Sequence, residues 1–287
     1  MWIRQCLLTA LILATILVNS CSTSSCPQQT LNIGIVSYDP IMPPLENYQT
    51  FQKYLGAKTC SFVNLEPSLN ELNAIDRIKN KDWSLVFAPP GLVAIAMDQE
   101  QYIPIFTLAS LPNQRSVIIV NQDSSFQTLS DLNNQIIGLG QPGSATGYYL
   151  PLYDLYGLTL AEVRFSRIPK NLLQWLANNE VKAVALSEDE FQEYRRDFPA
   201  DQFRILHKTR PVVSGAVLLS PKVDRKQEEQ IRQAMKQANS SIVANAGYVI
   251  DSPIPDYREF IKFVQKVRPI ESKLKQKPVV LSSNNDE

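Results

Sequence analysis

The sequence predicts an α/β protein with two doubly wound lobes, joined by two crossovers and separated by a cleft. Three observations indicate this class. Strand-like apolar runs alternate with helix-like runs from residue 31 onward, which is typical of sheets with parallel strands. A second such series begins at Arg115. Extended segments near residues 110–115 and 210–216 bracket that second series, so the chain passes between the two units twice.

Composition and charge narrow the class of partner. The chain has 287 residues, of which 44% are hydrophobic and 20% are charged, enough apolar material for one large or two medium domains. Its 28 basic and 28 acidic residues cancel. Because no basic face stands out, we expect no nucleic-acid partner, and electrostatic recognition must be local.

The N-terminal residues have the pattern of a bacterial lipoprotein signal. Arg4 precedes the apolar stretch from Leu7 to Val18, which is too short to span a bilayer. The sequence LVNSC resembles the cleavage box in which a small residue precedes the cysteine that is acylated. We predict a signal peptide over residues 1–20, lipidation at Cys21 and a polar tether over residues 21–30. An ordinary signal or an uncleaved anchor is the alternative.

Two cysteines, Cys26 and Cys60, remain as thiols in the predicted mature protein. Cys26 lies shortly before the first predicted strand, and Cys60 lies directly before the second. Neighbouring parallel strands start at the same edge of a sheet, and the compartment is oxidising, so a disulfide between the two is one expectation. Two unpaired cysteines are the alternative, because spacing does not establish the required approach of the Cα atoms.

The first lobe is predicted over residues 31–112 and 214–270. Its first part has strands at 31–36, 61–65, 83–88 and 102–109, with helices over 45–55, 69–78 and 91–97. The chain returns through an extended segment at 211–220. A helix with core spacing follows and carries Ile231, Ala234, Met235, Ala238 and Ile242. A last helix, about residues 256–267, precedes a polar segment that we expect to be a flexible tail over 271–287.

The second lobe is predicted over residues 113–213. Its strands are expected at 115–120, 135–140, 163–168 and 182–186. A short helical turn opens at SDL, and a longer helix covers 170–179. Another helix begins with a capping box from Ser187 to Glu190.

The segment GSATGYY, from Gly143 to Tyr149, places two hydroxyls and two glycines between a strand and a helix. In one interpretation the Ser and Thr side chains only cap the free N–H groups of the first helical turn. In the other, those hydroxyls and N–H groups face an anion. Both interpretations remain open on these residues alone.

Three segments together resemble the extracytoplasmic solute-binding proteins of phosphate, phosphite and phosphonate ABC transporters: LNIGIVSYDP, DWSLVFAPPGLVAIA and TLSDLNNQIIGLGQPGSATGYYLPLYDLYG. The similarity runs over about residues 30–265. It implies a type II periplasmic binding fold without catalytic activity, cofactor or metal. It also implies a small anionic ligand and a membrane permease as partners. We expect a lipid-anchored monomer in the cell envelope, facing the periplasm or exterior.

The resemblance implies a binding loop of Ser144, Ala145, Thr146, Gly147 and Tyr148. In this loop Ser144 and Thr146 bond ligand oxygens, and the helix N-terminus adds partial positive charge. Tyr38 follows the first strand at the sheet edge that faces the cleft in doubly wound sheets. Tyr38 either donates its hydroxyl to the ligand or packs on nearby prolines as a rim aromatic.

Three positions depart from the family's pattern. Lys182 stands where the family commonly has an acidic residue, Ser84 where a first-lobe strand has one, and Val93 where an aromatic follows the Gly-Pro turn. The missing acids would hold an amino group, so we expect a phosphorus oxyanion without an ammonium. A Lys182 that faces solvent is the alternative, and a sensing or scaffolding lipoprotein with a degenerate site is the alternative function.

Other basic residues and the single histidine complete the candidates. Arg115 and Arg210 flank the predicted crossovers. At that place each side chain either binds an anion or faces solvent. His207 is the only histidine and lies near no nucleophile motif. Since HExxH, CxxC and Walker sequences are also absent, the sequence predicts a binding protein and not an enzyme.

Overall fold

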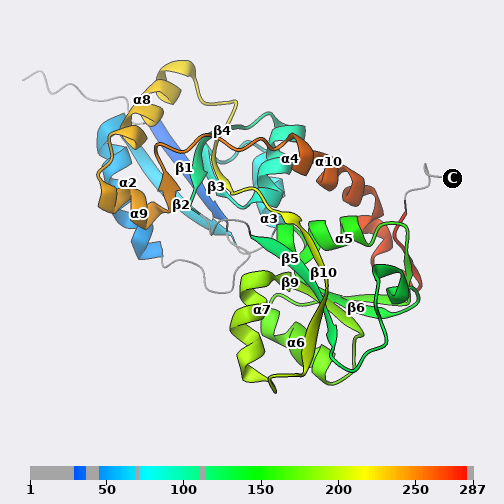
Figure 1. Cartoon of the computed structure of the whole chain (residues 1–287). Coiled ribbons are helices and arrows are strands. Elements are labelled where there is room, and N and C mark those ends of the chain that lie inside the picture. The colour runs from blue at the N-terminus through cyan, green and yellow to red at the C-terminus, as the bar shows by residue number, and fades with distance from the viewer. Residues whose placement is uncertain (1–28, 37–44, 69–70, 110–113, 283–287) are drawn as a thin grey trace, which may run out of the picture.

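The computed structural model of the chain describes residues 29–36, 45–68, 71–109 and 114–282. The predicted signal peptide, the lipidation site Cys21, Cys26 and Tyr38 lie outside the described residues. Two sheets, each covered by helices, form two lobes side by side (Figure 1).

Lobe 1 is built on a six-stranded sheet of order β12-β4-β11-β3-β1-β2. Its strands are β1 (Gln29–Val36), β2 (Ser61–Ser68), β3 (Leu85–Ala88), β4 (Ile103–Leu108), β11 (Ala216–Leu219) and β12 (Tyr248–Val249). Its helices are α2 (Leu45–Thr59), α3 (Glu71–Lys79), α4 (Pro90–Glu100), α8 (Arg225–Lys236), α9 (Ser240–Ala246) and α10 (Arg258–Val267). β1 is parallel to β2 and β3, whereas β11 is antiparallel to β3 and β4. The sheet is therefore mixed, because β11 enters it in the reverse direction after the chain has passed through lobe 2.

Lobe 2 is built on a five-stranded sheet of order β10-β5-β9-β6-β8. Its strands are β5 (Arg115–Asn121), β6 (Ile136–Leu139), β8 (Glu162–Phe165), β9 (Ala183–Ser187) and β10 (Phe203–Pro211). Its helices are α5 (Leu150–Asp154), α6 (Pro169–Ala177) and α7 (Glu188–Tyr194), with short turns η1 (Leu129–Leu132), η2 (Ala145–Tyr149) and η3 (Arg195–Asp197). β6 is parallel to β8 and β9, while β5 is antiparallel to both of its neighbours.

The two lobes share one continuous hydrophobic core. It includes Val93 of α4, Tyr149 of η2, Leu152 of α5 and Phe263 of α10. In Figure 1, α10 runs beside α4 of lobe 1 and then approaches α5 of lobe 2. The lobes are therefore packed against each other along this side, in addition to being joined by the two crossovers.

The C-terminal segment corrects one expectation. The polar composition of residues 271–287 predicts a flexible tail, but residues 271–282 are packed. After η4 (Arg268–Lys273), β13 (Val279–Val280) pairs antiparallel with β7 (Thr159–Leu160). Leu274, Val279 and Leu281 are at most 4% exposed. Lobe 2 buries these few apolar side chains, and burial outweighs the polarity of their neighbours.

Local signals decided some element boundaries. The capping box is confirmed: Ser187 Oγ accepts from the Glu190 N–H at 3.1 Å, and Glu190 Oε2 accepts from the Ser187 N–H at 2.8 Å. The helix expected through Ile231 and Ile242 is in fact two helices. The first ends at Lys236. Asn239 caps the second, since its Oδ1 accepts from the Ile242 N–H at 2.9 Å, as Asn side chains do at helix starts.

Among the described residues, none of the helices combines the length and apolar character that crossing a bilayer requires.

Candidate functional site

The segment GSATGYY forms the turn between β6 and α5. Gly143 has a φ of 96°, and η2 is a single π-helical turn. Ser144 caps this turn, because its Oγ accepts from the Gly147 N–H at 2.9 Å. The Ser144 carbonyl accepts from the N–H groups of Tyr148 and Tyr149 at 3.2 and 3.0 Å. The capping interpretation thus describes what the Ser144 oxygen does, while its O–H remains a separate donor group.

Two glycines allow this turn to fold back on the end of β6. The Gly140 N–H donates to the Gly147 carbonyl at 2.9 Å. A Cβ on Gly140 would lie 3.0 Å from the Gly147 Cα. A Cβ on Gly147 would likewise lie 3.1 Å from the Gly140 Cα, so the two glycines allow backbone to pack closely on backbone.

A small cavity lies beside the turn and includes an arginine that the sequence analysis missed. It has a volume of about 30 Å³, and its lining includes Ser144, Gly147, Ser166, Arg167 and Glu190. Arg167 comes close to Ser144 because β8 runs parallel to β6, so both strands end at the same sheet edge. The signal that could have found Arg167 was the pair of strands QIIGLG and VRFSRI, which end in adjacent loops.

Hydrogen bonds on either side of Arg167 fix its loop. Ser166 Oγ donates to the Ile168 carbonyl at 3.0 Å and accepts from the Ile168 N–H at 3.1 Å. The side chain of Arg167 is exposed, whereas nearby Lys170 pairs with Asp197 at 2.7 Å. Arg167 is thus the cationic side chain in the lining of this cavity.

Three residues of the predicted binding loop do not line the cavity. Ala145 and Tyr148 are 6% and 2% exposed, and Thr146 is half-buried. The Tyr148 ring packs edge-to-face on Tyr149, with 5.1 Å between ring centroids. Its hydroxyl bonds to Glu271 of the C-terminal segment. Of the predicted set, the structure brings Ser144 and Gly147 to the cavity.

Ser84 and Lys182, which stand where the family has acidic residues, both lie far from this turn. Ser84 immediately precedes β3, and its N–H donates to the Asn32 carbonyl at 2.8 Å. Lys182 immediately precedes β9 and is exposed. Both therefore lie at the strand ends opposite to α4 and the turn, so neither supports an argument about the ligand's amino group. Val93 is fully buried in the shared core.

The other basic candidates take part in contacts near the lobe junction. Arg115 Nη1 donates to the Thr209 carbonyl at 3.1 Å. The Arg210 guanidinium lies over the rings of Tyr153 and Phe263, at 5.6 and 4.6 Å from their centroids. His207 Nε2 lies 2.8 Å from an Asp154 carboxylate oxygen. Neither Arg115 nor Arg210 is part of the cavity lining.

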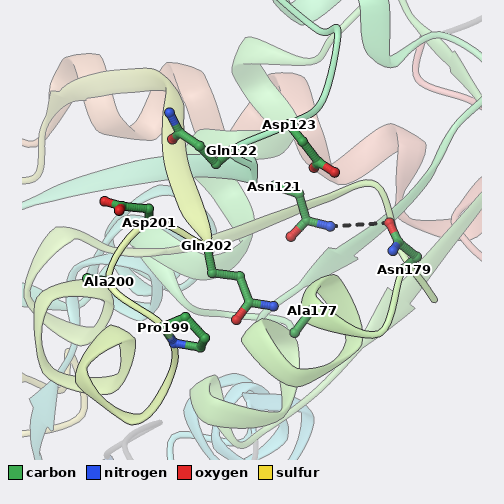
Figure 2. A pocket seen from close by; sticks show the side chains of 9 residues that line it. All are labelled: Asn121, Gln122, Asp123, Ala177, Asn179, Pro199, Ala200, Asp201 and Gln202. Carbon is green, nitrogen blue, oxygen red and sulfur yellow. Dashed lines mark hydrogen bonds between the residues drawn. The ribbon is translucent and has the colours of Figure 1, made fainter.

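A larger cavity, of about 590 Å³, lies at the outer end of lobe 2 (Figure 2). Its lining includes four amide side chains and the carboxylates of Asp123 and Asp201, but no basic side chain. Asn121 Nδ2 donates to Asn179 Oδ1 at 3.2 Å across one side of it (Figure 2). β5 runs from the crossover to this cavity, a distance of about 20 Å at 3.3 Å per residue. Two carboxylates repel an anion, so this cavity is no candidate for the predicted ligand.

Cys60 is disulfide-bonded. It is the only cysteine among the described residues. The pairing of Cys60 with Cys26 stays a prediction.

A family model matches residues 33–266, and it describes periplasmic substrate-binding proteins of phosphonate ABC transporters. Similar solved structures include XAC2383 from Xanthomonas citri bound to ATP, which is 18% identical with a TM-score of 0.71 and covers 84% of this chain and 98% of its own. PhnD1 from Prochlorococcus marinus in complex with methylphosphonate is 17% identical, with a TM-score of 0.64 and coverage of 84% and 98%. A binding component of an ABC phosphonate transporter, PA3383 from Pseudomonas aeruginosa, is 18% identical, with a TM-score of 0.58 and coverage of 77% and 80%.

At these identities the solved structures show the fold alone, and that fold is the predicted type II periplasmic binding fold. A search of curated protein sequences finds no relative of this chain.

Proposed function

Because the chain belongs to the family of periplasmic substrate-binding proteins of phosphonate ABC transporters, we propose that it captures a small phosphorus oxyanion between its lobes. Phosphate, phosphite and a simple phosphonate are the candidate ligands. Proteins of this family bind a solute for a membrane permease and are not enzymes. We propose that this chain delivers its ligand to such a permease as a monomer.

The observation that carries the proposal is the proximity of Ser144 and Arg167 in one cavity. A guanidinium donates two parallel N–H groups to the oxygens of a phosphonate, and such charge-assisted bonds are about twice as strong as neutral ones. The Ser144 O–H supplies a further donor. Thr146 belongs to the same turn and is half-buried. Its hydroxyl binds the ligand in this proposal once the turn rearranges.

The size of the cavity sets a condition on binding. Its volume of about 30 Å³ has room for about two waters at most, because roughly 10–15 Å³ of such volume holds one water. The residues that line the cavity all belong to lobe 2, so a phosphonate, which is larger than a water, enters only if the turn and the loop of Arg167 move. Movement of two lobes about their crossovers is the ordinary way in which two-lobed binding proteins admit a ligand.

One observation favours the alternative of a sensing or scaffolding protein with a degenerate site. The carboxylate of Glu190 lines the same cavity as Arg167, and a carboxylate weakens the binding of an anion. Glu190 Oε2 accepts from the Ser187 N–H at 2.8 Å, which ties this carboxylate to a structural role. The two functions make opposite predictions for a binding assay.

Membrane attachment is a separate part of the proposal. The stretch that ends in LVNSC supports lipidation at Cys21, which would hold the folded lobes near the permease on the periplasmic or exterior side.

Calorimetric titration of the purified protein tests the ligand and the site together. The panel contains phosphate, phosphite, methylphosphonate, aminoethylphosphonate and sulfate. Arg167→Gln should weaken binding about ten- to a hundredfold, the effect of one lost hydrogen bond to a charged group. Lys170→Gln is the matched control, since Lys170 is a cation three residues away that pairs with Asp197. Tight binding that Arg167→Gln leaves unchanged would exclude this cavity, and no binding to the whole panel would favour the alternative function.

A further inference from the structure

A carboxylate and two buried tyrosines connect the C-terminal segment to the turn of the candidate site. The side chains of Tyr148 and Tyr149 both hydrogen-bond to Glu271. Tyr148 is 2% exposed and Tyr149 is fully buried. Burial raises the pKa of the Glu271 carboxyl, while Arg268 and the two tyrosine hydroxyls lower it by less. The proposed binding chemistry uses none of these three groups.

The C-terminal segment reaches this position by passing from one lobe to the other. α10 packs against α4 of lobe 1, and β13 pairs with β7 beside lobe 2. Between them, η4 carries Glu271 to the tyrosines. In Figure 1 this last part of the chain lies next to α5, which directly follows the turn. The apolar residues of the segment belong to the same core as the two tyrosines; they are Ile270, Leu274, Val279 and Leu281.

Backbone hydrogen bonds connect the two tyrosines that bind Glu271 to Ser144. The N–H groups of Tyr148 and Tyr149 both donate to the Ser144 carbonyl. Ser144 Oγ in turn accepts from the Gly147 N–H. A carboxylate that fixes both tyrosine side chains therefore restricts the turn that carries Ser144. Glu271 is half-buried, and removing a carboxylate from water costs free energy that its hydrogen-bond partners offset, so the two hydroxyls stabilise this arrangement.

We propose that Glu271 is a positioning residue of the ligand site. It holds Tyr148 and Tyr149, and through them it holds the turn from Ser144 to Gly147 in the conformation that binds the ligand. The part of this inference that concerns affinity rests on the proposed function, whereas the part that concerns the order of the turn does not.

Hydrogen exchange of the full chain without ligand tests the order of the turn. In Glu271→Ala, the amides of residues 147–150 should exchange about ten- to a hundredfold faster, because the hydrogen bonds to a charged acceptor are lost. Glu271→Gln keeps one acceptor oxygen and should restore part of the protection. Glu259→Ala is the matched control, since Glu259 is a side-chain carboxylate of α10 that pairs with Lys262 and is 69% exposed. Unchanged exchange in Glu271→Ala would overturn the proposal.

Titration with methylphosphonate separates positioning from mere stability. Val279→Ala loosens the packing of the same segment but leaves the tyrosine hydrogen bonds in place, so it serves as a variant of lowered stability. Glu271→Ala should weaken binding about tenfold more than Val279→Ala at an equal loss of Tm. An equal weakening in both would reduce Glu271 to a structural role and overturn the proposal. If the wild type binds no member of the anion panel, the proposed function fails, and hydrogen exchange still decides the role of Glu271.

Discussion

Gly91 at the start of α4 lies against Gly143 of the turn, so close that a Cβ on Gly91 would be 2.3 Å from the Gly143 carbonyl oxygen. The same Cβ would be 3.1 Å from the Tyr149 ring. Real Cβ atoms do not tolerate the shorter distance, so the first turn of α4 and the binding turn fit together only with glycine at this position. This contact joins lobe 1 to the turn of lobe 2 that carries Ser144.

Gly91→Ala should therefore push the two lobes apart at this point. We expect the free energy of unfolding to fall by about 1–3 kcal/mol, the usual cost of overpacking, as measured by urea denaturation. Gln99→Ala, on the exposed end of the same helix, is the control and should change little. A Gly91→Ala protein as stable as the wild type would mean that the two lobes do not meet here in solution.

Ser144→Ala and Thr146→Ala should separate capping from ligand binding. Ser144 caps the Gly147 N–H, so its loss should lower stability by about 0.5–2 kcal/mol. If both hydroxyls contact the ligand, each variant should also bind methylphosphonate about ten- to a hundredfold more weakly. Thr146→Ala should leave the Tm of the protein without ligand nearly unchanged. Wild-type affinity in both variants would remove the turn from the site.

The pH dependence of stability should reveal the carboxyl of Glu271. Burial raises its pKa in the folded protein above the ordinary value of 4.5, so folding favours the protonated form. Between the ordinary and the raised pKa, the folded state binds more protons than the unfolded state, and stability falls as pH rises. Below pH 4.5 this contribution is fully present, and above the raised pKa it is lost.

Glu271→Gln cannot titrate and should lack that slope. Urea denaturation from about pH 4 to 8 gives the free energy of unfolding of both proteins. The difference between the two measures the slope due to Glu271, because the contributions of the other titrating groups cancel. Parallel curves for the two proteins would show that the Glu271 carboxyl titrates alike in the folded and unfolded states.

We expect Cys26 to be the partner of Cys60 in its disulfide. Gln29 of β1 lies opposite Ser61 of β2, so Cys26 is three residues and Cys60 one residue before this pair. Proteolysis without reduction should release one linked peptide with both cysteines, detected by mass spectrometry. Cys60→Ser should then lower stability by about 2–4 kcal/mol. A linked peptide that joins Cys60 to another cysteine would contradict the assignment.

Lipidation at Cys21 is tested by metabolic labelling with a fatty acid in a bacterial host. The wild type should carry the label, and Cys21→Ser should lose it, because the thiol that receives the lipid is gone. Cys26→Ser is the control and should keep the label. A labelled, processed Cys21→Ser protein would disprove the anchor.

The sequence by itself determined the elements whose signals are local. The box from Ser187 to Glu190 begins a helix because its two hydrogen bonds form within four consecutive residues. The alternation of strands and helices likewise predicted two α/β lobes, and the segments that resemble a transporter family predicted its fold. These patterns depend on neighbours in the chain, which any reader of the sequence can see.

Only the tertiary structure decided what depends on residues far apart in the chain. A run such as Ala216–Leu219 is recognisable as a strand, but its antiparallel direction follows from the route of the chain through the other lobe. The polar sequence around Leu281 predicts a flexible tail, but packing against lobe 2 buries this side chain. Arg167 joins Ser144 because two parallel strands end at one edge, whereas Lys182 lies at the opposite end. Composition carries no information on which end of a strand faces the other lobe, since packing between distant segments sets it.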